Sequence, residues 1–161
     1  ADFNTWPQLS RAVLFIMMFL GGCMGSTAGG FKMSRISVLF QIARNELRRS
    51  VNPRAVASVR LNGTTLDSDG ERAVLNYLVL YLAVIVSVFL LISFEGFGFE
   101  TNLTAAVSCV NNIGPGLGVI GPAGSYAGYS QFSKLVLSLA MLMGRLEIYP
   151  LLTLFTMRKR S

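Results

Sequence analysis

An uncharged apolar run from residue 74 to residue 94 places the strongest limit on what this chain can fold into. The run lies between Arg72 and Glu95 and carries no charge over its whole length. A helix needs about 20 apolar residues to cross the hydrocarbon layer of a bilayer. Backbone polar groups in that layer must be satisfied internally, which favours a helix. We therefore predict a transmembrane helix at 74–94.

The composition supports a membrane protein and argues against an enzyme. Of 161 residues, 52% are hydrophobic and 14% are charged, whereas a soluble domain has about 25% charged residues. The absence of histidine excludes His-based metal sites and His-assisted catalysis within this chain. Cys23 and Cys109 are isolated, so no disulfide framework is indicated. We expect no enzymatic activity and no cofactor. The chain begins at Ala1 and lacks a signal-peptide pattern, so we expect a fragment of a longer protein.

Two other apolar stretches are less regular. Residues 135–157 are long enough to span a membrane but contain Arg145 and Glu147. Residues 12–20 are too short alone. If this stretch continues to residue 43 it becomes long enough, but glycines interrupt it in the middle. The charge at Arg145 costs about 2.5 to 3.5 kcal/mol on membrane-insertion scales. It should therefore face a pore or an acidic partner, and a buried ion pair that only fixes packing is the alternative.

Basic residues predict the orientation. Residues 32–60 contain seven basic side chains and one acid, whereas residues 95–134 contain one basic side chain, Lys134. Basic loops stay in the cytoplasm. We therefore expect residues 44–72 and the C-terminus inside, and residues 95–130 outside. The net charge of +6 is then explained by topology, and no nucleic-acid partner is expected, because no basic stripe interleaves with aromatic residues.

The inner linker at 51–72 has the character of a soluble segment. Asn62-Gly63 separates two short alternating runs, a pattern typical of a tight β-hairpin. We predict a small hairpin near residues 56–66.

The outer segment "TNLTAAVSCVNNIGPGLG" predicts a short helix followed by irregular backbone. We expect the helix at 102–110, capped by Thr101 or Asn102. Nine helical residues rise about 14 Å, which is roughly half of a ~30 Å hydrocarbon core. That length suits a re-entrant helix, and the carbonyls of an extended "NIGPG" could replace the water shell of potassium or sodium. An exterior loop over a surface helix is the alternative.

The stretch "GGCMGSTAGG" at 21–30 allows three interpretations. A phosphate loop is excluded because the chain has no GxxxxGK[ST] pattern. A helix-packing surface is possible, since small residues let helices approach closely. However, each glycine costs a helix about 1 kcal/mol relative to alanine. A loop in the middle of a broken helix is the simpler interpretation.

Four stretches resemble a known family. "NNIGPGLGVIGP" and "MLMGRLEIYPLLTLF" are similar to the fourth repeat of the bacterial Trk/Ktr potassium-uptake family, in its TrkH branch. "FLGGCMGSTAGGFKMSRI" and "RNELRRSVNPRAV" resemble the end of its third repeat. The resemblance covers essentially the whole chain. It implies an all-α integral membrane protein with potassium-channel-like repeats, each a helix, a re-entrant pore helix and a second helix.

The resemblance divides the chain into three parts. Residues 1–50 would end the third repeat with an outer mouth and a broken inner helix. Residues 51–72 would be the cytoplasmic linker. Residues 73–161 would form the fourth repeat, with an inner helix at 131–157.

The resemblance also implies functional residues. A selectivity filter would lie at 111–116, with potassium bound by backbone carbonyls of Asn112, Ile113 and Gly114. The glycine-rich loop would act as a gate, and Arg145 would be a cation barrier below the filter. The filter residues are Asn111, Asn112, Ile113, Gly114, Pro115 and Gly116. The gate residues are Gly21, Gly22, Cys23, Met24, Gly25, Ser26, Thr27, Ala28, Gly29 and Gly30.

The implied function is potassium uptake across the bacterial inner membrane, with potassium as substrate. The implied partners are the remaining repeats, a second copy in a homodimer, the lipid membrane and a cytosolic nucleotide-binding ring of RCK type. The residues leave sodium against potassium and the mode of coupling open. The alternative function is a membrane scaffold that transports nothing and uses its glycine-rich segment for packing.

Overall fold

The computed structural model describes residues 2–20, 33–51, 60–61, 64–65 and 68–145. Helices dominate this part of the chain, which confirms the predicted all-α fold class. The elements in order are the 3-10 turn η1 (Phe3–Thr5), α1 (Gln8–Phe19), α2 (Met33–Val51), β1 (Arg60–Leu61), β2 (Thr64–Thr65), α3 (Ser68–Ile92), α4 (Phe99–Val110), the 3-10 turns η2 (Gly118–Ile120) and η3 (Tyr126–Gly128), and α5 (Gln131–Arg145).

Helix α3 is the long apolar helix expected from the sequence, with shifted ends. It runs from Ser68 to Ile92 rather than from 74 to 94. Its first turn carries Asp69 and Glu71, which the positive end of the helix dipole stabilises. Its most apolar 18-residue stretch has a mean hydropathy of 2.6, and α3 is the single described helix that is long and apolar enough to cross a membrane.

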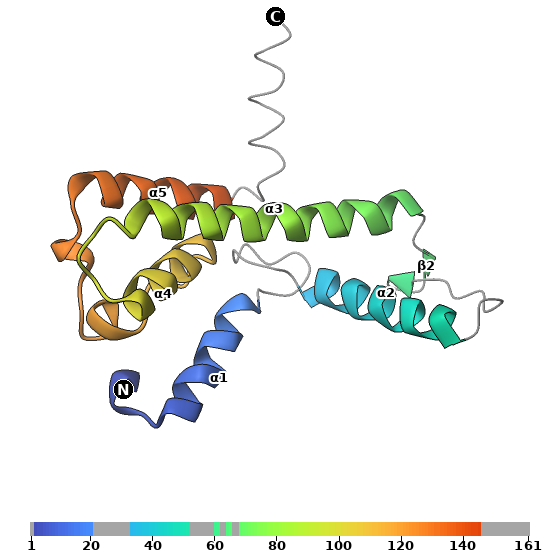
Figure 1. The fold of residues 1–161 in the computed structure, drawn as a ribbon, viewed down its shortest axis with the longest axis horizontal. Coiled ribbons are helices and arrows are strands. Elements are labelled where there is room, and N and C mark those ends of the chain that lie inside the picture. Colours follow the sequence, from blue (N-terminus) through green and yellow to red (C-terminus); the bar gives the residue numbers. More distant parts are fainter. Residues whose placement is uncertain (1, 21–32, 52–59, 62–63, 66–67, 146–161) are drawn as a thin grey trace, which may run out of the picture.

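The other helices are arranged around α3. Helix α5 lies alongside its C-terminal half, α4 lies below that half, and α2 lies below its N-terminal half (Figure 1). Ile92 of α3 and Val107 of α4 are fully buried where these helices meet, and Leu137 and Ala140 of α5 are buried with them. The core of the described chain therefore surrounds the short helix α4.

The linker contains two short paired strands where the sequence predicts a hairpin. Strands β1 and β2 pair antiparallel, with Arg60 opposite Thr65 and Leu61 opposite Thr64. They flank Asn62-Gly63. Nearby, the Arg35 guanidinium of α2 stacks over the Tyr77 ring of α3 at 3.9 Å, a favourable cation–π geometry.

The predicted start of the short helix was wrong. Helix α4 begins at Phe99, with Gly98 as its N-cap, and Asn102 N donates to the Gly98 carbonyl. Thr101 and Asn102, which the sequence suggested as caps, lie inside the helix and are buried. Polar residues near a helix start resemble caps in sequence, but here tertiary contacts use them.

Helix α5 begins at Gln131, where the inner helix was expected. Its described part ends at Arg145. The remainder of the predicted 131–157 helix and the predicted gate at 21–30 lie outside the described residues.

Candidate functional site

Helix α4 is a short helix buried almost completely in the molecule. Its 12 residues correspond to about 18 Å, a little over half of a ~30 Å hydrocarbon core. Residues 104–110 are all buried. The carbonyl end of the helix, which carries about half a negative charge, therefore lies inside the protein next to residues 111–116, the predicted filter segment.

A polar stripe on α4 supports the segment that follows it. The Thr104 hydroxyl accepts a hydrogen bond from Leu117 N at 3.0 Å and donates to the Glu100 carbonyl at 2.8 Å. The Ser108 hydroxyl donates to the Pro115 carbonyl at 2.9 Å. These side chains pair buried backbone groups that a sheet or helix would otherwise satisfy. They hold the irregular segment against α4.

The filter segment adopts special backbone conformations. Asn112 has φ +56° and Gly114 has φ +105°. Left-handed values suit glycine, and asparagine tolerates them better than most residues. The turn at Asn111 and Asn112 ends the helix, since Ile113 N donates to the Ser108 carbonyl at 3.0 Å. After this turn the chain runs back along α4 toward its start.

Of the six carbonyls of residues 111–116, those of Gly114 and Pro115 have protein partners, and the other four accept no hydrogen bond from the described residues. The Tyr126 hydroxyl donates to the Gly114 carbonyl at 2.7 Å, and the Pro115 carbonyl accepts from Ser108. Within the described residues, the carbonyls of Asn112 and Ile113 accept no hydrogen bond. These two oxygens are available for a desolvated cation. The Gly114 oxygen has a second lone pair and can still contribute.

The far end of the segment, at Gly118, is joined to the start of the chain. Asn4 Nδ2 donates to the Gly118 carbonyl at 3.0 Å, and Gly118 N donates to Asn4 Oδ1 at 2.9 Å. Gly118 has φ +73°. Gly121 leaves the space that the Asn4 amide occupies. One side chain thus fixes both backbone groups of Gly118.

The start of the segment, at the end of α4, is in close contact with α5. A Cβ atom at Gly144 would overlap the Val110 carbonyl and lie 3.0 Å from Asn112 Nδ2. Asn112 Nδ2 itself donates to the Met141 carbonyl of α5 at 3.1 Å. Glycine at 144 therefore permits α5 to approach the end of α4.

Aromatic residues form a layer behind the segment. The Phe97 and Tyr129 ring centroids are 4.6 Å apart, and the Tyr126 and Tyr129 centroids are 6.0 Å apart. The Tyr129 hydroxyl donates to Asn102 Oδ1 at 2.8 Å. This layer places the Tyr126 hydroxyl at the Gly114 carbonyl.

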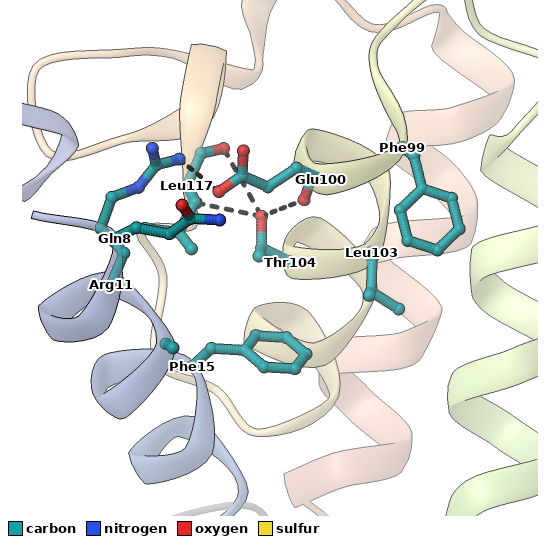
Figure 2. Close-up of a pocket in the computed structure, with 9 residues that line it drawn as sticks. Gln8, Arg11, Phe15, Phe99, Glu100, Leu103, Thr104 and Leu117 are labelled. Carbon is teal, nitrogen blue, oxygen red and sulfur yellow. Dashed lines mark hydrogen bonds and ion pairs between the residues drawn. The ribbon is translucent and has the colours of Figure 1, made fainter.

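A pocket lies between α1 and α4, beside the polar stripe (Figure 2). An ion pair between Arg11 of α1 and Glu100 of α4 closes one side, and Thr104 and Leu117 lie next to it. The Phe15 ring lies on the side away from the ion pair. The pocket marks the junction of α1 with the pore helix.

The predicted filter residues 111–116 begin at the end of α4 and run back along it, so that Gly116 lies next to Thr104. Arg145 is exposed at the end of the described part of α5. Sequence reasoning missed the supporting side chains Asn4, Thr104, Ser108 and Tyr126. The spacing of Thr101, Thr104 and Ser108 on one face of an otherwise apolar helix was the available signal. Nothing in the sequence pattern indicated Asn4.

The fold and site define a class of protein. A buried half-length helix, a glycine-bearing segment that turns back along it, and two longer flanking helices have the architecture of a pore hairpin in a membrane protein.

The comparisons then identify the family. The TrkH family model, described as cation transport protein, matches residues 1–161. The chain is 34% identical over 155 residues to the Trk system potassium uptake protein TrkG of Escherichia coli, and 37% identical over 156 residues to TrkI of Halomonas elongata. Its structure is similar to the crystal structure of the potassium transporter TrkH from Vibrio parahaemolyticus, with a TM-score of 0.85 and 36% identity over 96% of this chain. The chain belongs to the TrkH family.

The match is to part of each relative. The matches to TrkG and to TrkI each cover 96% of this chain. The chain spans 32% of the length of each of these relatives, and also 32% of the TrkH chain in the crystal structure.

Proposed function

We propose that this chain forms the end of one repeat and the whole of the next in a potassium uptake pore. The observation that carries the proposal is the pair of adjacent carbonyls, at Asn112 and Ile113, that accept no hydrogen bond from the described residues at the end of the buried helix α4. Carbonyl oxygens can replace the hydration shell of potassium. The names of the relatives support potassium as the ion.

The local electrostatics support a cation at this place. The carbonyl end of α4 adds negative potential, and no charged side chain is needed in the ring of oxygens. One hairpin supplies one side of such a ring. The remaining repeats of the transporter would supply the others.

Several further features rest on the family resemblance. We propose residues 21–30 as a gate and Arg145 as the cation barrier below the filter. We also propose a homodimer in the bacterial inner membrane, with residues 44–72 and the C-terminus in the cytoplasm. A nucleotide-binding ring of RCK type is the proposed cytosolic partner, with the basic region 44–60 as a docking surface.

The test replaces the filter glycine in a complete transporter that contains this sequence. Gly114 has φ +105°, and a Cβ there would meet nothing within 4 Å. Gly114→Ser therefore changes the backbone preference without a clash. Rubidium uptake into vesicles is measured with potassium or sodium as the competing ion. We expect Gly114→Ser to reduce the preference for potassium over sodium by about fivefold or more, because backbone strain of this kind costs about 1 to 3 kcal/mol.

Gly96→Ser is the matched control. A Cβ at Gly96 also meets nothing within 4 Å, and Gly96 lacks the positive φ. The control should insert and select ions like the parent. Equal ion preference in Gly114→Ser and Gly96→Ser would reject the filter assignment, and a parent without rubidium uptake would favour the scaffold alternative.

A further inference from the structure

Two consecutive asparagines at the inner end of the filter segment use their side chains to contact other helices. Asn111 is buried, with 5% of its surface exposed. Its Nδ2 donates to the Met18 carbonyl of α1 at 2.7 Å, and its Oδ1 accepts from the Tyr81 hydroxyl of α3 at 2.8 Å. Asn112 Nδ2 donates to the Met141 carbonyl of α5. The end of α4 is thus bonded to three neighbouring helices.

The bond to Met18 occurs where helix α1 ends. Helix α1 stops at Phe19, so the Met18 carbonyl is among the last four, which have no partner within the helix. The Asn111 amide satisfies it from a residue 93 positions away. A buried carbonyl without a donor is costly. This contact therefore fixes the end of α1 against the end of α4.

We propose that Asn111 is a positioning residue for ion selectivity, because its side-chain amide holds the inner end of the filter at a set distance from the end of α1. The inference rests on the proposed function, since it assigns a role to a neighbour of the proposed ion-binding carbonyls. Asn111 directly precedes Asn112, so any rotation of Asn111 moves the two available carbonyl oxygens. The Tyr81 bond fixes the amide plane, so that Nδ2 points to α1 and Oδ1 points to α3.

Asn102 and Tyr129 form a comparable hydrogen-bonded pair that is not connected to α1. At the opposite end of α4, Asn102 is 2% exposed and accepts from the Tyr129 hydroxyl at 2.8 Å. Its Nδ2 donates to the Phe97 carbonyl at 3.3 Å. Asn102 and Asn111 have the same side chain, are both buried and lie near opposite ends of α4. However, both partners of Asn102 lie within the hairpin next to α4. Selectivity should depend on Asn111 and not on Asn102.

The experiment compares Asn111→Leu with Asn102→Leu in the complete transporter. Leucine removes the amide at similar size without adding charge. Initial rubidium uptake into vesicles is measured with potassium or sodium as competitor, and normalised to folded protein by size-exclusion chromatography. We expect Asn111→Leu to reduce the potassium-over-sodium preference by about fivefold, the equivalent of one hydrogen bond. We expect Asn102→Leu to lower the yield or melting temperature while keeping the parent's preference.

A milder pair keeps the test decisive if a leucine variant does not fold. Tyr81→Phe removes the hydroxyl that orients Asn111, and Tyr129→Phe removes the equivalent bond to Asn102. We expect the ion preference to fall in Tyr81→Phe alone, by about twofold, because the Asn111–Met18 bond remains.

The outcomes separate the two claims. A selective parent whose Asn111 and Asn102 variants, or Tyr81 and Tyr129 variants, keep the same ion preference would overturn the positioning role while leaving the pore intact. A parent without potassium-competed rubidium uptake would overturn the proposed function, and the positioning role with it. A preference lost only in the Asn111 or Tyr81 variant would support both.

Discussion

A single residue, Gly144, determines how closely α5 packs against the pore helix α4. Gly144 is buried against the Val110 carbonyl, and Asn112 Nδ2 lies on the same side. The atom that a Cβ would meet first belongs to the backbone, which cannot rotate away as a side chain can. The position therefore tolerates no side chain without a shift of α5.

We expect Gly144→Ala to destabilise the protein. Overpacking of a close contact costs about 1 to 3 kcal/mol, and here it also lengthens the bond between Asn112 Nδ2 and Met141. The measurement is the melting temperature of the purified transporter in detergent. Gly96→Ala is the control, because a Cβ at Gly96 meets nothing within 4 Å. Equal melting temperatures for the two variants would contradict the close approach of α5.

At the scale of elements, the start of α5 is held by the loop after α3. Ser130 Oγ accepts a hydrogen bond from Ser133 N at 3.2 Å, as the side chain of an N-cap does. Glu95 Oε1 accepts from Ser130 N at 3.1 Å and from the Ser133 hydroxyl at 2.6 Å. Hydrogen bonds from Ser130 and Ser133 hold the pKa of Glu95 below its usual value. The positive end of the helix dipole, at the start of α5, also stabilises the negative charge of Glu95.

The lowered pKa of Glu95 predicts a pH dependence with a defined sign. Because the folded protein favours the charged form, the stabilisation is complete above the ordinary carboxylate pKa of about 4.3, and it is lost as pH falls toward the lower folded value. Glu95→Gln should therefore melt lower than the parent at pH 7, and the difference should shrink as pH falls below that value. Melting curves at several pH values provide the measurement. A difference that stays constant with pH would show that the charge has no role.

The elements differ in how well the sequence predicted them. Helix α3 followed directly from an apolar run, because no other structure satisfies that run in a bilayer. The end of α4 followed from "NNIGPG", where glycines and asparagines stop a helix. The start of α4 was predicted three residues late because Thr101 and Asn102 look like caps. Their actual roles depend on partners such as Tyr129, whose proximity only the folded structure reveals.

At the scale of the whole molecule, the described chain contains a junction between α1 and the hairpin that follows α3. Polar contacts join the two parts at both ends of the junction. Asn4 bonds to Gly118 at one end, and Asn111 bonds to Met18 at the other. The Arg11–Glu100 ion pair lies in the N-terminal half of α1. Each contact joins residues about a hundred positions apart, so no local pattern in the sequence could have predicted it.

The orientation of this junction in the membrane provides the last prediction. The excess of basic residues at 32–60 predicts that residues 44–72, which include the end of α2, lie inside and that the weakly charged segment after α4 lies outside. Ser50 near the end of α2 and Ala123 between η2 and η3 are both exposed, so a cysteine at either position should be accessible. Ala123 is preferable to Gly124, where a Cβ would overlap the Val119 carbonyl.

In intact cells, a membrane-impermeant thiol reagent should label Ala123→Cys and leave Ser50→Cys unlabelled, whereas in opened membranes it should label both. The parent, with Cys23 and the buried Cys109, gives the background. Labelling of Ser50→Cys alone in intact cells would invert the orientation. The carbonyl end of α4 would then approach the membrane centre from the cytoplasmic side, and the proposed filter would open toward the wrong compartment for uptake.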